Sequence, residues 1–256
     1  KNGKPCEDFG KNGQVDLKDG LGQVSAGEYS VTSPPAIIGN KIIVGAFILD
    51  RTHNNMPSGV VRAYDVVTGE LLWYWNAIPP GTKTTFDDQG NPLFTRGTPN
   101  VWSIISVDKE RDLIFLPTGN TSTDFFGGFR QNLDFFSSSV VALNANNGEL
   151  VWHYQLVHHD IWDFDTPAQP TLFDFEKNGE VIPALAQPTK MGLLFLLNRE
   201  TGIPLFPVEE RPVPQIGFVD GEYLSPTQPF PTVPKPLHPL SFEANEAFCF
   251  TFWDKG

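Results

Sequence analysis

Two stretches decide the fold, AYDVVTGELLW (63–73) and ALNANNGELVW (142–152), and they align with each other without a gap. Each predicts a strand that ends in Asp or Asn, a tight turn whose glycine takes a positive φ, and a second strand that carries a tryptophan. LLNRETGIPLF (196–206) is a weaker copy with Phe206 in place of the tryptophan, and KNGKPCEDFG (1–10) looks like the tail of an earlier copy. Such periodic aromatic and glycine signals are typical of propeller blades.

The rest of the chain has the pattern of short strands. Runs of β-branched and aromatic residues are bounded by Gly, Pro, Asn and Asp, and no apolar pattern at helical spacing is sustained. The predicted strands lie in KIIVGAFIL (41–49), GVVRAYDV (59–66), LLWYWN (71–76), DLIFLPTGN (112–120), SSSVVALNA (137–145), LVWHYQLV (150–157) and MGLLFLLN (191–198). We therefore predict an all-β chain with long inserted loops, and such loops on a rigid scaffold commonly carry function.

Composition excludes several classes of protein. The 256 residues are 40% hydrophobic and 12% aromatic, which is ample for a packed core. The net charge of −12 argues against a nucleic-acid partner, which needs a basic face. No apolar run approaches the ~20 residues of a membrane span, and no charged-then-apolar leader follows residue 1. Cys6 and Cys249 are too few for a disulfide framework, lack the spacing of a zinc site, and leave the redox compartment open.

The densest set of polar residues lies in HHDIWDFDTPAQP (158–170). By itself this stretch is compatible with a metal site, a catalytic base with its supports, or a polar turn. Adjacent strand residues point to opposite faces, so we do not expect His158 and His159 to bind one metal together. Asp160 is predicted to brace the loop, and Asp165, which precedes Thr-Pro, is predicted to make a turn.

The Asp-x-x-Thr-Gly-x-x-x-Trp repeat resembles the tryptophan-docking motif of the pyrroloquinoline quinone (PQQ) dehydrogenases, whose fold is an eight-bladed β-propeller. The surrounding sequence is similar to the membrane-bound glucose dehydrogenase branch and its quinate and polyol relatives. The similarity is carried by TSPP (32–35), SGVVRAYDVVTGELLW (58–73), TRGTPNVWS (95–103), LPTGNTSTDFFGG (116–128), SSSVVALNANNGELVW (137–152), VHHDIWDFDTPAQPTL (157–172), QPTKMG (187–192) and the RPVPQ and LSPTQPF segments within 211–230. It implies that residues 1–256 form a single partial propeller domain of about four blades, roughly half the ring. This piece of a longer chain is expected to be inactive alone.

The resemblance also implies roles for residues that touch the substrate or cofactor. Asp163 matches the catalytic base, and such a carboxylate can take the proton of an alcohol as its hydride leaves. Lys190 matches a residue that contacts the quinone, where an ammonium can stabilise the charge that grows on an oxygen during reduction. Trp102 matches the flat floor beneath the cofactor, and Thr32 matches a further cofactor contact.

A divalent metal is implied in the same way. Asp50, Asn120 and Asp163 match metal ligands, and their oxygen atoms suit Ca²⁺ or Mg²⁺. Two positions depart from the pattern. Arg51 stands where the glucose-type enzymes have a second amide ligand, and Phe47 stands where relatives carry a small hydroxyl residue. Without the resemblance, Asp50 and Asn120 would be taken as turn residues at strand ends.

We therefore expect a PQQ-dependent dehydrogenase that oxidises a sugar, a polyol or a cyclic hydroxy acid. The resemblance implies ubiquinone or a cytochrome as electron acceptor and a periplasmic location. Association with the inner membrane would come through parts outside this chain. One alternative is a non-catalytic PQQ-repeat propeller, which would not need the proposed site residues together. Another is a simple-alcohol quinoprotein dehydrogenase, which Asn120 favours, whereas Lys190 favours the glucose or quinate branch. The substrate itself is not determined by these residues.

Overall fold

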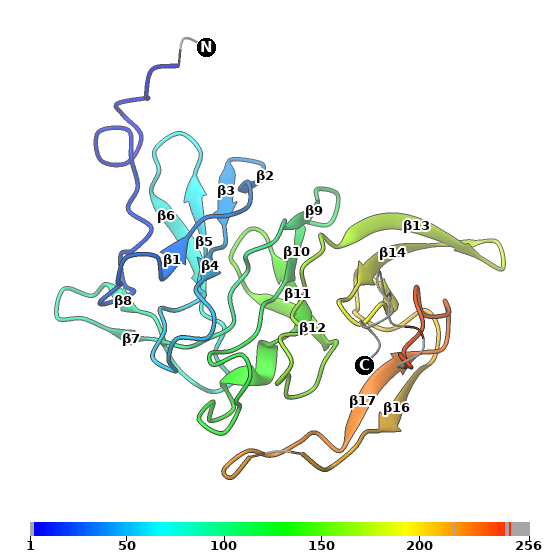
Figure 1. Cartoon of the computed structure of the whole chain (residues 1–256). Coiled ribbons are helices and arrows are strands. Elements are labelled where there is room, and N and C mark those ends of the chain that lie inside the picture. Colours follow the sequence, from blue (N-terminus) through cyan, green and yellow to red (C-terminus); the bar gives the residue numbers. More distant parts are fainter. Residues whose placement is uncertain (1–2, 218, 244–245, 247–256) are drawn as a thin grey trace, which may run out of the picture.

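The computed structural model describes residues 3–217, 219–243 and 246, and these are nearly all β (Figure 1). Two four-stranded antiparallel sheets form the centre. The first contains β2 (Ala36–Ile38), β3 (Lys41–Val44), β5 (Val61–Asp65) and β6 (Leu71–Trp75), and the second contains β9 (Ser106–Asp108), β10 (Leu113–Pro117), β11 (Ser139–Asn144) and β12 (Leu150–Gln155). A three-stranded sheet follows, made of β13 (Thr171–Lys177), β14 (Glu180–Pro188) and β15 (Leu194–Asn198).

The remaining elements are short and lie between or beyond these sheets. They are the strand pairs β1 (Tyr29–Ser30) with β4 (Phe47–Ile48), β7 (Thr85–Phe86) with β8 (Pro92–Leu93), and β16 (Val208–Pro212) with β17 (Thr227–Pro231), and the 3₁₀ helix η1 (Leu133–Phe136). No helix in the described part of the chain is long and apolar enough to cross a membrane. Cys6 is exposed with a free thiol, whereas Cys249 lies outside the described residues.

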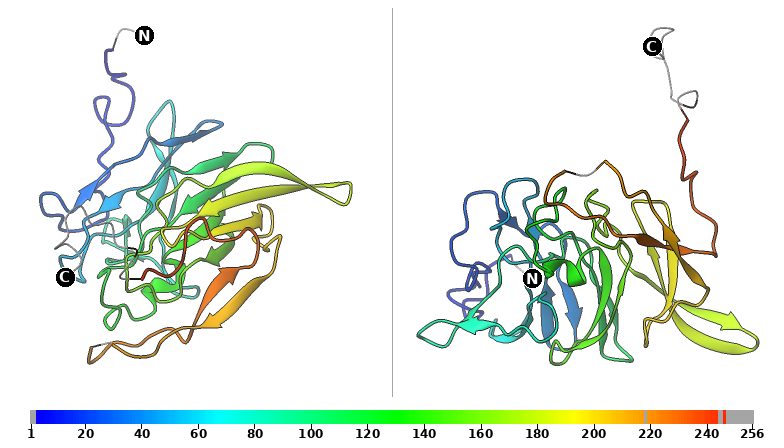
Figure 2. Two further views of the ribbon diagram at one scale, coloured as in Figure 1. Left: turned by 45° about the vertical axis from the view of Figure 1, so that its right-hand side comes forward. Right: turned by 90° about the horizontal axis from the view of Figure 1, so that it is seen from below.

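The three larger sheets stand side by side in chain order, like blades, as the colours from blue through green to yellow show in Figures 1 and 2. The first strand of the middle sheet, β9, contacts the first strands of both neighbours, β2 and β13. Apolar residues fill the space between consecutive sheets. Ile43 and Trp75 meet Ile114 at the first junction, and Phe115 meets Phe195 at the second. All seven predicted strand segments contain strands, which confirms the all-β prediction.

The repeated tryptophans lock each sheet to the next one. The Trp73 indole N–H donates to the carbonyl of Ala145 at 3.0 Å, and its ring covers Gly148, where a Cβ would lie 2.5 Å from a ring carbon. Trp152 repeats the arrangement on Gly202 and donates to the carbonyl of Arg199 at 3.0 Å. Both glycines also have a positive φ. Glycine is therefore required for two reasons: the turn needs a positive φ, and a side chain would clash with the tryptophan ring of the preceding repeat.

The two weaker copies of the repeat behave differently. Phe206 packs edge-on against Phe175 of β13, with ring centroids 5.7 Å apart, and Lys177 lies over its ring. It therefore contacts its own sheet and no following glycine among the described residues. The expectation of a blade tail at 1–10 is not met in the described residues 3–10, which contain a turn at residues 7–9 and no strand.

Connections alternate between the two ends of the sheets because neighbouring strands are antiparallel. One end has short turns at residues 39–40, 66–70, 109–112 and 145–149. The other end has the long connections, residues 45–60, 76–105, 118–138 and 156–170, which gather towards the bottom of Figure 1. Long loops from separate blades can meet only at that second end.

Candidate active site

The six residues expected at a site all lie on that loop-rich end. Thr32 lies between β1 and β2, Asp50 follows β4, Trp102 precedes β9, Asn120 follows β10, Asp163 lies between β12 and β13, and Lys190 lies between β14 and β15. Three sheets thus contribute to one region, which explains how positions far apart in the chain come together.

Lys190 lies at the centre of this group. Its Nζ lies 2.5 Å from Asp165 Oδ1 and 3.5 Å from Asp163 Oδ2, and it donates to the Asp163 carbonyl at 2.7 Å. Burial opposes the positive charge, but the two carboxylates outweigh it and raise the pKa of Lys190. The ammonium therefore stays charged at neutral pH beside the expected catalytic base.

Asp165 was predicted to make a turn, and that prediction is wrong. The residue is only 5% exposed, its Oδ2 accepts the indole N–H of Trp102 at 2.7 Å, and its Oδ1 pairs with Lys190. Burial raises the pKa of Asp165, although both partners favour the ionised form. The prediction failed because the two donors come from other sheets, which no local turn pattern can indicate.

Trp102 is held from several sides. The hydroxyls of Thr32 and Ser33 both donate to its backbone carbonyl, at 2.9 and 2.6 Å. A Cβ at Gly119 would lie 3.3 Å from Trp102 Cδ1, so the ring rests close to bare backbone. Thr32 thus lies beside Trp102, with its hydroxyl engaged by the chain itself.

A second feature is an excess of negative charge. Burial, together with the charges of Asp124, Asp163 and Asp165, raises the pKa of Asp50 to about 6, and Arg51 acts against them. No hydrogen bond from the described residues reaches the Asp50 carboxylate. Carboxylates that repel one another and lack donors are suited to an oxygen-ligated cation.

Asn120 borders this group, but its amide is already occupied. Its Nδ2 donates to the backbone carbonyls of Asp124 and Asp160, at 3.1 and 2.9 Å. Its Oδ1 accepts from Thr121 N and Ser137 Oγ, each at 2.8 Å. Reversing the amide would set its oxygen against two carbonyls, so the side chain organises the loop in this structure.

Sequence reasoning missed Asp124. This carboxylate is 4% exposed and accepts the backbone N–H of Arg51 at 2.9 Å, which brings it beside Asp50. The only signal was its position four residues after Asn120 in the polar run NTSTD. Its charge acts on Asp50, so it adds a further carboxylate to this region.

The donor chemistry fits a divalent cation, although these side chains do not complete its coordination. Within the described ranges, no three His, Cys, Asp or Glu side chains converge as a metal site. Ca²⁺ requires 6–8 oxygen ligands and Mg²⁺ requires six. Asp124 and Asp163 act electrostatically on Asp50 and make the region negative, and a cation bound there would need further oxygen ligands.

The adjacent histidines His158 and His159 face different partners. His158 Nε2 lies 3.1 Å from Glu210 in β16. His159 is buried, with Nδ1 2.8 Å from Asp134 and Nε2 2.9 Å from Glu222, and it stacks on Tyr223. Both rings therefore anchor the β16–β17 segment to the loop that carries Asp163.

Asp160 braces the loop, as predicted. The carboxylate is 1% exposed, and it accepts hydrogen bonds from Ser138 Oγ at 2.7 Å and from Trp162 N at 2.9 Å. Burial raises the pKa of Asp160 despite these donors. Because its carboxylate bonds to Ser138 and Trp162 and contacts neither Lys190 nor Trp102, Asp160 is separate from the network around Asp163.

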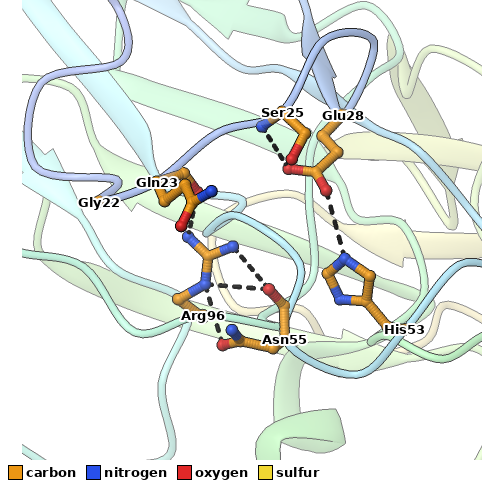
Figure 3. Close-up of a pocket in the computed structure, with 7 residues that line it drawn as sticks. All are labelled: Gly22, Gln23, Ser25, Glu28, His53, Asn55 and Arg96. Carbon is orange, nitrogen blue, oxygen red and sulfur yellow. Dashed lines mark hydrogen bonds and ion pairs between the residues drawn. The ribbon is translucent and has the colours of Figure 1, made fainter.

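A cavity of about 310 Å³ lies away from these residues (Figure 3). Arg96 crosses it and donates to the carbonyls of Leu21, Gln23 and Asn55. His53 lies 3.2 Å from Glu28 on the other side. These polar groups satisfy one another and join the segment before β1 to the loop that carries Asp50. We therefore assign the residues around this cavity a structural role.

The fold and these residues define a class of protein. The PQQ family described as "Glucose/ethanol/alcohol dehydrogenase, beta-propeller domain" matches residues 1–256, and the chain belongs to it. It is 43% identical over 235 residues to the quinoprotein glucose dehydrogenase of Escherichia coli (strain K12), covering 90% of this chain and 29% of that protein. It is 41% identical to the glycerol dehydrogenase large subunit of Gluconobacter oxydans (90% and 31%) and 42% identical to the quinate/shikimate dehydrogenase (quinone) of Acinetobacter baylyi (89% and 28%). The chain thus spans about three tenths of the length of these curated relatives.

Solved structures agree on the fold. A quinohemoprotein alcohol dehydrogenase from Pseudomonas putida matches with a TM-score of 0.56 and 26% identity, over 77% of this chain and 30% of that one. A europium-containing methanol dehydrogenase matches with a TM-score of 0.57 and 25% identity, over 70% and 34%. The predicted propeller fold and the predicted family are therefore confirmed.

Proposed function

We propose that the chain forms part of the active site of a PQQ-dependent dehydrogenase that oxidises a sugar, a polyol or a cyclic hydroxy acid. One observation carries the proposal: Asp165 joins Trp102 to Lys190, which also contacts Asp163. A binding scaffold has no need for a charged network, built on the buried carboxylate of Asp165, that joins three such residues. The names of the relatives, which are glucose, glycerol and quinate/shikimate dehydrogenases, support the substrate class.

We further propose that residues 1–256 are one partial propeller domain of a longer enzyme. The share of the relatives that the chain covers supports this, as do the two complete tryptophan junctions. By resemblance alone, we assign the enzyme to the periplasm, with ubiquinone or a cytochrome as acceptor and an attachment to the inner membrane through other segments.

When bound, PQQ would supply a quinone that accepts hydride and Ca²⁺ or Mg²⁺ would supply Lewis acidity. Trp102 offers a flat ring on which a planar cofactor can stack, and Thr32 holds that residue in place. Lys190 can donate a hydrogen bond to a quinone oxygen. Asp50 and Asp163, with Asp124, would hold the cation. Asn120 would join them only by giving up one of the two hydrogen bonds to its oxygen.

Asp163 is the proposed proton acceptor. Its backbone has a φ of 57°, in the left-handed region that few non-glycine residues adopt. Apart from Lys190, its carboxylate has no hydrogen-bond or ion-pair partner among the described residues. It is therefore free to accept the hydroxyl proton of an alcohol that lies against the cofactor.

The full-length enzyme, supplied with PQQ and either Ca²⁺ or Mg²⁺, tests this proposal. PQQ binding is followed by absorbance, and turnover is measured with glucose, glycerol, quinate and ethanol using an artificial electron acceptor. We expect saturable PQQ binding, turnover of at least one of the first three substrates, and loss of activity with a chelator. Binding without turnover of any substrate would support the scaffold alternative, and turnover of ethanol alone would support the simple-alcohol alternative. The isolated 256 residues should turn over nothing.

A further inference from the structure

We propose that Asp165 is a positioning residue that sets Trp102 and Lys190 relative to each other before the cofactor binds, an inference that rests on the proposed function. Its carboxylate is buried, and each oxygen serves one partner: Oδ1 pairs with Lys190 and Oδ2 accepts the indole N–H of Trp102. Among the described residues these are its only hydrogen-bonding and ion-pairing partners. The carboxylate therefore acts on two expected cofactor contacts and on nothing else.

The two partners need this restraint for different reasons. Lys190 has a flexible four-carbon stem and a point charge, so its tip would sample many positions without an anchor. Trp102 is already held through its backbone by Thr32 and Ser33, but only Asp165 fixes the direction of its indole N–H. Asp165 thereby links the orientation of the ring to the position of the ammonium.

The anchored ammonium keeps one donor for a ligand. Of its three N–H groups, one points to Asp165 Oδ1 and one to the Asp163 carbonyl. The third N–H has only the longer contact to Asp163 Oδ2 at 3.5 Å, and the side chain is 32% exposed, so this N–H can turn towards a ligand. Fixing two donors defines where the third one points, and this is the geometry that recognition of a quinone oxygen requires.

Asp165→Asn is the informative substitution because an amide cannot serve both partners. If its oxygen accepts from Trp102, its NH₂ group faces the ammonium, and the reverse orientation sets two N–H donors against each other. Residues that orient ligands in this way typically contribute about 10–100-fold to affinity or activity. We expect D165N to weaken PQQ binding by about that factor.

The test uses the full-length enzyme and a PQQ titration followed by absorbance, with wild type, D165N, K190M and the double variant. We expect D165N to weaken binding in the wild-type background and to have a several-fold smaller effect in K190M, because part of its role is exerted through Lys190. D108N is the matched control. Asp108 is also buried and pairs with Arg199 at 2.9 Å, but it lies on the short-turn end. It should leave the PQQ affinity unchanged.

The outcomes separate this inference from the proposed function. If the wild-type enzyme does not bind PQQ, the proposed function fails. If the wild type binds PQQ and D165N binds it equally well, or if the effects of D165N and K190M are additive, Asp165 is no positioning residue and the proposed function stands. Should D165N fail to fold by circular dichroism, D165E keeps the charge but moves the carboxylate by one methylene away from its positions on Trp102 and Lys190. We expect D165E to weaken PQQ binding several-fold, and unchanged binding would overturn the inference.

Discussion

The loop of residues 156–170 carries two charged clusters that differ in how far positive groups offset their carboxylates. Around His159, two carboxylates face the imidazole, and Arg130 contributes a second positive charge. Around Asp163, the carboxylates of Asp50, Asp124, Asp163 and Asp165 gather beside Lys190 and Arg51, and Asp124 also shares the charge of Arg130 with the first cluster. The first cluster is complete with the chain's own residues, as a structural anchor should be. The second holds negative charge that its own cations do not offset, which is expected of a site that binds a cation.

The largest expected effect is on catalysis, from Asp163→Asn in the cluster around Asp163. The amide keeps the shape of the side chain but cannot accept the substrate proton, and general-base assistance is typically worth ~10²–10⁴ in rate. We expect kcat of the full-length enzyme to fall by about that factor while circular dichroism and PQQ binding stay close to wild type. Retention of most activity would show that the proton acceptor is another residue.

A second effect, on stability, should come from His159→Gln in the cluster around His159. The change leaves Asp134 and Glu222 buried without the imidazolium, and breaking a buried pair costs about 3 kcal/mol or more. Urea unfolding at pH 5.5 should show this loss in the free energy of unfolding. Unfolding free energies within 1 kcal/mol of wild type at that pH would mean that the cluster is no anchor.

The pH dependence of that loss has a definite sign. The hydrogen bonds to Asp134 and Glu222 raise the pKa of His159 against the effect of burial, so its stabilisation is full below the ordinary value of 6.5 and disappears as the pH rises through the raised value. The pKa values of Asp134 and Glu222 are lowered despite burial, so their part is lost only as the pH falls below their ordinary values of 3.8 and 4.5. The difference between wild type and H159Q should therefore be largest between about pH 4.5 and 6.5 and smaller at pH 9.

The smallest effect should come from Asp50→Asn without metal. Burial and then Asp124, Asp163 and Asp165 raise the pKa of Asp50 from 3.8 to about 6, so the folded state favours the protonated carboxyl. Its contribution to stability is present below pH 4 and is lost as the pH rises through about 6. Metal-free D50N should therefore melt a few degrees above metal-free wild type at pH 7.5. Added Ca²⁺ should stabilise wild type more than D50N, and equal stabilisation would remove Asp50 from the ligands.

Much of the fold could be predicted because its signals are local. The strand runs have their own periodicity, and the repeat places a tryptophan four residues after each glycine in its two strong copies. Trp73 and Trp152 then dock on Gly148 and Gly202 in the same manner. The weak copies failed where the local pattern was incomplete. Phe206 turned to its own sheet, and the described residues 3–10 contain no strand.

The sequence by itself determined the family, the blade repeat and the polar residues that reach the loop-rich end. Only the tertiary structure decided how those residues are used. Asp165, which the sequence suggested was a turn residue, bridges donors that lie 63 positions before it and 25 after it. The oxygen of Asn120, which suggested a metal ligand, is taken by neighbours. A carboxylate or amide has the same chemistry in any loop, and its role depends on which donors and charges the packing of the sheets brings within reach.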